Sequence, residues 1–131
     1  MIRLKEIEEC MRPNFVFDKT GKRMQTLEHI DGTKELARTI FVGIADMYGI
    51  DGSFVMDYLE LGYDTYRNRL RHFRSTYKLA KNRDDDGLLQ SLPNSDIKFY
   101  NKTRLCINAI GIATKRDAHS LINQYTNDES D

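Results

Sequence analysis

The strongest constraint on the fold is a run of apolar residues that recurs every three or four positions between residues 33 and 48. This spacing places the apolar side chains on one face of an α-helix and predicts a helix that packs on a core. Asp31, Gly32 and Thr33 can cap its start, and Gly49 suits a left-handed end. The apolar members of the run are Leu36, Ile40, Phe41, Ile44, Met47 and Tyr48.

Two more helices are predicted directly after this one. The first covers residues 53–60, with Ser53 as its N-cap. A turn at residues 61–63 follows, and Asp64 caps a second helix that runs to Lys81. The apolar stripe of this second helix has spacings of four, three and four, and consists of Tyr66, Leu70, Phe73 and Tyr77.

The segments on either side are less regular. Residues 2–11 show a helical pattern that Pro13 stops. Phe15 to Phe17, followed by a turn at residues 18–21, predicts a short hairpin that returns through Met24 and Leu27, or else an irregular stretch.

The C-terminal third is predicted to be mainly helical. Residues 84–94 contain three adjacent acids and a proline, which favour a surface connection. A helix is predicted over residues 97–110, with a strand at Cys106, Ile107 and Ile112 as the alternative, and a last short helix over residues 118–125. We therefore expect a mostly α-helical bundle in one domain, residues 1–131, with a helix-turn-helix core at 33–82 and a helical extension at 94–126.

Charge is distributed unevenly along a chain whose formal net charge is zero. Residues 63–83 contain seven Lys or Arg and one acid, whereas the segments before and after them each have a net charge of −3. A short helix, a glycine-containing turn and a longer helix with a basic outer surface together predict a helix-turn-helix that docks on double-stranded DNA.

The candidate DNA-binding residues belong to this basic helix. Those at its start, Thr65, Arg67, Asn68 and Arg71, can reach base edges, since Arg pairs with guanine and Asn with adenine. Arg69 lies on one flank of the helix. Cations further along would meet phosphates and position the protein without reading sequence. These are Arg74, Lys78 and Lys81, with Arg83 beyond them.

Two other interpretations of the basic face stay open. It can be an ordinary solvated helix surface, although mixed signs are more usual on such a surface because they form i,i+4 pairs. It can also bind an acidic protein, which would make the chain a non-enzymatic interaction module. Alternatively, the protein partner is a second copy of the chain, which would make it a homodimer. The protein's own acids at residues 84–86 can supply part of the countercharge.

Residues 33–80 resemble the C-terminal DNA-binding domain of the bacterial replication initiator DnaA. The resemblance is carried by Leu36-Ala37-Arg38, Ile40-Phe41 and Ala45, then by residues 53–61, Gly62 and Asp64-Thr65. It implies a helix-turn-helix whose recognition helix opens at Asp64-Thr65. The Arg before Asp and the His-Ser pair of that family's motif are absent here, so its sequence specificity does not transfer. The chain also has no Gly-x-x-x-x-Gly-Lys phosphate loop, which excludes the initiator's ATPase.

Other functional classes have little support in the sequence. His29, His72 and His119 are far apart, and Cys10 and Cys106 lack the spacing of zinc sites, so we assign no metal, cofactor or catalytic residue. The longest uncharged apolar run, residues 40–45, is far too short to span a bilayer, and the start lacks the features of a signal peptide. We expect a cytoplasmic protein that is not an enzyme.

Overall fold

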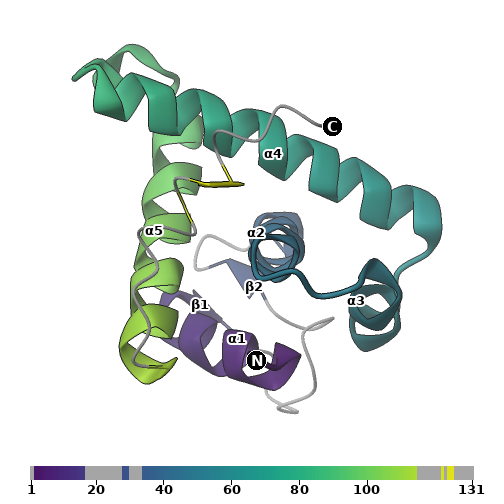
Figure 1. Ribbon diagram of the computed structural model, residues 1–131. Coiled ribbons are helices and arrows are strands. Elements are labelled where there is room, and N and C mark those ends of the chain that lie inside the picture. Colours follow the sequence, from purple (N-terminus) through teal and green to yellow (C-terminus); the bar gives the residue numbers. More distant parts are fainter. Residues whose placement is uncertain (1, 17–27, 30–33, 115–121, 123, 126–131) are drawn as a thin grey trace.

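The computed structural model describes residues 2–16, 28–29, 34–114, 122 and 124–125. The described part of the chain forms a mostly α-helical bundle with one short two-stranded sheet. Helix α2 lies at the centre, α4 crosses it on one side, and α1 and α3 lie on the other (Figure 1). The helices are α1 (Leu4–Met11), α2 (Lys34–Met47), α3 (Gly52–Leu59), α4 (Tyr63–Asp85) and α5 (Asn94–Thr114).

Helix α2 is buried on nearly all sides. Every residue from Ile40 to Ala45 is buried, and Ala37, Thr39 and Met47 are buried as well. A helix that is buried over most of its circumference must be surrounded by other elements. The other helices therefore pack around α2, and their buried side chains form one continuous cluster with those of α2.

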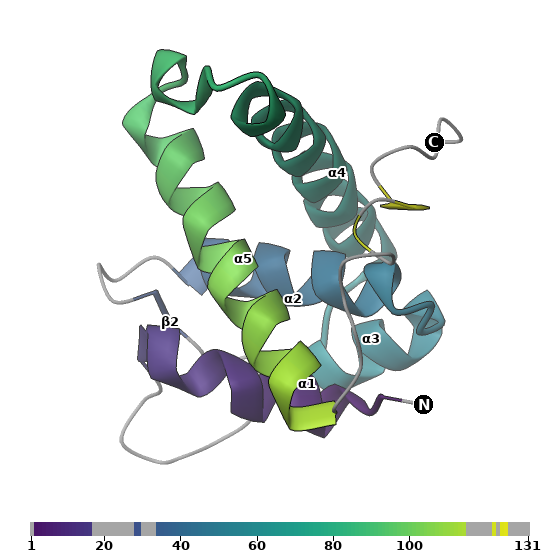
Figure 2. The ribbon, with the colours of Figure 1, turned by 60° about the vertical axis from the view of Figure 1, so that its left-hand side comes forward.

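Helices α1 and α5 pack against each other and against α2, and the Tyr58 hydroxyl of α3 donates a hydrogen bond to Glu8 of α1. Helix α5 runs from the C-terminal end of α4 back to α1 (Figure 2). The strands β1 (Phe15–Val16) and β2 (Glu28–His29) pair antiparallel, with Phe15 opposite His29. A strand is thus present at residues 15–16 and its partner is Glu28–His29, while the predicted return through Met24 and Leu27 lies outside the described residues.

Helix α4 approaches α2 closely at one point. The ring of Phe73 is fully buried and lies directly over Gly43. A Cβ atom at position 43 would lie 2.1 Å from Cγ of Phe73, so only glycine fits beneath this ring. The contact fixes which face of α4 points inward, and Tyr66, Phe73, Tyr77 and Ala80 are buried on that face as the apolar stripe predicted, with Leu70 partly buried beside them.

Several predicted helix ends are wrong. Asp51, not Ser53, caps α3, because its carboxylate accepts hydrogen bonds from the backbone N–H and the hydroxyl of Ser53 at 2.8 and 2.7 Å. Gly62, not Asp64, precedes α4, and Asp64 lies in the first turn of that helix. Gly49 does take the predicted left-handed conformation after α2, with φ of 77°.

The acidic run at residues 84–86 does not begin a connection, because α4 continues to Asp85. Lys81 pairs with Asp85 at 2.6 Å, and Asp84 accepts a hydrogen bond from the Tyr100 hydroxyl at 2.9 Å. These partners offset the unfavourable position of acids at a helix C-terminus. The strand alternative at Cys106, Ile107 and Ile112 is also wrong, since all three belong to α5. The predicted last helix lies largely outside the described residues.

We expect Gly43→Ala to destabilise the protein. Alanine favours a helix over glycine by up to about 1 kcal/mol, but forcing an added methyl group into a packed core costs roughly 1–3 kcal/mol. Urea unfolding should show a net loss of stability, and the loss should shrink when Phe73→Leu first removes the ring. An equal loss in both backgrounds would contradict the contact.

Candidate nucleic-acid interface

The connection between α3 and α4 is short and tightly bonded. Glu60 ends α3 in the left-handed conformation, with φ of 57° and ψ of 47°, and its N–H group bonds back to α3. The N–H of Leu61 donates to the carbonyl of Met56 at 2.9 Å, and Leu61 packs against the core. The chain then enters α4 through Gly62. This turn sets where the N-terminal half of α4 emerges from the bundle.

The exposed polar side chains in the N-terminal half of α4 include the four that the sequence places at its start. These are Thr65, Arg67, Asn68 and Arg71. Within the described part of the chain none of them makes a hydrogen bond or an ion pair. They are the residues that the sequence assigns to base edges, and the structure leaves their donors and acceptors available to a partner molecule.

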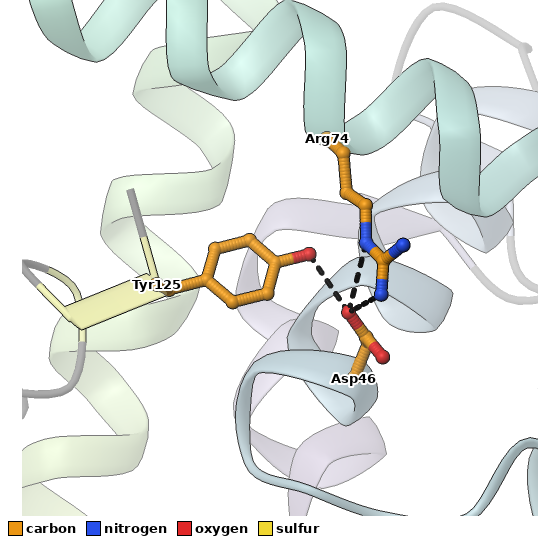
Figure 3. A network of polar contacts seen from close by, with 3 residues as sticks. All are labelled: Asp46, Arg74 and Tyr125. Atoms are coloured by element: carbon orange, nitrogen blue, oxygen red, sulfur yellow. Dashed lines mark hydrogen bonds and ion pairs between the residues drawn. The ribbon is translucent and has the colours of Figure 1, made fainter. Parts of the chain in front are cut away.

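Arg74 lies in a different environment. Its Nε and Nη2 atoms donate to Oδ2 of Asp46 on α2, at 3.2 and 3.0 Å (Figure 3). The hydroxyl of Tyr125 donates to the same oxygen at 2.9 Å. Burial, with the nearby charge of Asp46, raises the pKa of Tyr125, so the phenol stays a donor at neutral pH. Arg74, predicted to contact phosphate, therefore joins α4 to α2 and to the C-terminal segment.

The other predicted cations also have contacts inside the protein. Nη1 of Arg69 donates to the hydroxyl of the buried Thr39 at 3.3 Å, and Lys81 pairs with Asp85. Lys78 is half-buried and has an internal contact, and Arg83 donates to the Ser91 hydroxyl at 3.2 Å. The basic helix therefore divides into an outward-facing N-terminal half and a C-terminal half whose charges are largely engaged.

A second charge feature was not recognised in the sequence. Residues 39–66 contain no Lys or Arg but five acids. Asp51, Asp57 and Glu60 are exposed on α3 and at its two ends, and Asp64 is exposed in the first turn of α4. The edge of the molecule at α3 is therefore acidic, and the exposed arginines of α4 begin immediately after it. In the sequence, this change from acidic to basic surface is visible as a stretch without Lys or Arg that precedes the basic helix.

The described residues contain no group of three or more His, Cys, Asp or Glu side chains that could hold a metal ion. His72 is exposed, and its ring lies edge-on to Phe99 at 5.7 Å. Burial raises the pKa of the Cys106 thiol to about 12, so it is a poor nucleophile at neutral pH. Among the described helices none is long and apolar enough to cross a membrane.

Comparison of the chain with protein-family models, with curated proteins and with solved structures gave no match. The resemblance to the DNA-binding domain of DnaA stays a prediction from the residues. The functional argument therefore depends on the surface of α4 and on the chemistry of its side chains.

The Asp46 network should contribute to stability. We expect Arg74→Met to lower the free energy of unfolding by about 1–2 kcal/mol and Tyr125→Phe by about 1 kcal/mol, because each removes a hydrogen bond to a carboxylate. Because both groups bond to the same oxygen, their effects should be coupled. The loss of stability in the double variant should therefore differ from the sum of the losses in the two single variants. Urea unfolding measures each value. Arg71→Met, at an exposed site, should change stability by less than about 0.5 kcal/mol, and strict additivity would contradict the network.

Proposed function

We propose that this protein is a helix-turn-helix DNA-binding protein, a small transcription or replication regulator that places the N-terminal half of α4 in the major groove. The observation that carries the proposal is the row of exposed donors at Thr65, Arg67, Asn68 and Arg71, none bonded to another described residue. Base recognition requires donors and acceptors that the protein itself does not satisfy. An α-helix of this kind fits the width of the groove.

The arrangement of α3 and α4 supports this docking mode. In helix-turn-helix proteins the second helix enters the groove with its N-terminal residues at the bases, while the first helix crosses the backbone. Helix α4 follows α3 after a three-residue connection and extends over 23 residues, about 34 Å. The exposed acids of α3 would repel phosphates, so α4 has to supply the backbone contacts as well as the base contacts.

Asn68→Ala tests base recognition. A preferred site is first selected from random duplexes, and the affinities for that site and for a random duplex are then compared. We expect the variant to lose about 1–3 kcal/mol on the preferred site and almost nothing on the random duplex. The change does not alter charge, and the position is exposed, so the fold should be unaffected. Ser75→Ala, exposed on the same helix, is the control and should keep both affinities.

Failure to enrich any motif, or equal losses on both duplexes, would overturn base recognition. If the full chain binds no duplex at low salt but does bind a polyanionic protein, the alternative of a module for an acidic partner replaces the proposal. That alternative uses the same exposed arginines.

Arg71 and Arg74 should differ in their effect on the salt dependence of DNA binding. We expect Arg71→Ala to make the slope of log K against log salt shallower by about one unit, because the exposed Arg71 side chain bonds to no other described residue and can neutralise a phosphate. Arg74→Ala should leave the slope unchanged, because Asp46 already holds that guanidinium. Measuring duplex binding over a range of salt concentrations tests both expectations. A change of slope in Arg74→Ala alone would mean that Arg74, and not Arg71, contacts the phosphate.

A further inference from the structure

A cleft with a volume of about 490 Å³ opens between α2, α4 and α5. Figure 2 shows the three helices that form its sides. Its lining includes Thr39 of α2 and Phe99 of α5, which are both buried. Its rim is formed by the exposed Thr65, Asn68 and His72 of α4. This volume lies within the range of pockets that hold small organic ligands.

The lining combines hydrogen-bond donors with two apolar walls. The half-buried guanidinium of Arg69 stands against Thr39, and the Asn68 amide and the His72 ring lie along the same helix. Leu36 and Phe99 supply the apolar surface. None of the described residues that line the cleft is acidic. Guanidinium groups are planar forks that match carboxylates, and aromatic walls favour flat ligands.

We propose that this cleft binds a small aromatic carboxylate, with the carboxylate on the Arg69 side and the ring between Leu36 and Phe99. A neutral ring would lose the charge-assisted hydrogen bonds, and a short aliphatic acid would leave the apolar walls uncovered. The proposed ligands therefore contain both an aromatic ring and a carboxylate.

Occupancy of the cleft should also control DNA binding, and this step depends on the proposed function. Thr65 and Asn68 line the cleft and are also the proposed readers of base edges. A ligand that contacts them withdraws them from DNA, so ligand and preferred duplex compete. By linkage, the duplex lowers the affinity for the ligand by the same factor.

Benzoate is the probe for the ligand site, with the full chain and no DNA present. The ring resonances of His72 are followed by NMR during titration. We expect a saturable shift with benzoate, and affinities at least about fivefold weaker for acetate, which has the charge alone, and for benzamide, which has the ring alone. No saturation, or equal affinity for all three compounds, would overturn the proposal.

A pair of variants separates the cleft from general charge effects. Asn68→Asp adds a negative charge inside the cleft and should weaken benzoate binding at least about fivefold by repulsion. Ser75→Asp adds the same charge to α4 outside the cleft and should change it less than about twofold. Both positions are exposed, so both variants should fold. Equal weakening in the two variants would overturn the site.

The coupling is measured by binding of the selected duplex with and without saturating benzoate. A lower duplex affinity supports competition, and an unchanged affinity overturns it. If the chain binds no duplex while benzoate still saturates the cleft, the proposed DNA-binding function fails and the ligand site stands.

Discussion

The packing of the Phe73 ring onto Gly43 determines how the rest of the structure is arranged. This contact fixes where α4 lies along α2 and which face of α4 points toward α2. The same ring also packs near Tyr77, Phe99 and Tyr125. Once Phe73 points inward, the next residue, Arg74, reaches Asp46 three positions further along α2 than Gly43. Arg71, two positions before Phe73, is then directed to solvent.

This setting gives the two halves of α4 different roles. The C-terminal half is tied to α2 by the ion pair between Arg74 and Asp46 and to α5 by the hydrogen bond from Tyr100 to Asp84, and Lys81 pairs with Asp85 within the helix. The N-terminal half is anchored mainly through Tyr66 and through the short turn after α3, and its outer face carries the polar side chains that bond to no other described residue. A helix that is held in place at one end and exposes polar side chains at the other is suited to recognise a partner molecule.

Much of the fold could be predicted from local patterns, because a buried helical face leaves a period in the sequence. The stripes of α2 and α4 are examples, and both helices occur where the periods predict them. Helix ends were less predictable: whether Asp51 or Ser53 caps α3 depends on the backbone geometry of one residue. The extension of α4 to Asp85 depends on Tyr100, a residue of another helix.

The candidate site could also be predicted only in part. The exposure of Thr65, Arg67, Asn68 and Arg71 followed from their angular positions relative to Tyr66. The engagement of Arg74 could not be inferred, because Asp46 is 28 positions away and Tyr125 is 79 positions from Asp46. Sequence periodicity defines which way a side chain points, whereas the partner it finds there depends on tertiary packing.

The acidic edge at residues 39–66 next to the arginines of α4 also affects how the protein behaves in solution. With a formal net charge of zero, two copies have no overall repulsion, while the acidic edge of one attracts the arginines of the other. Dissolved salt screens the attraction between the acidic edge and the arginines over about 10 Å at 0.1 M. The protein should therefore be less soluble in dilute buffer and dissolve better as salt is added.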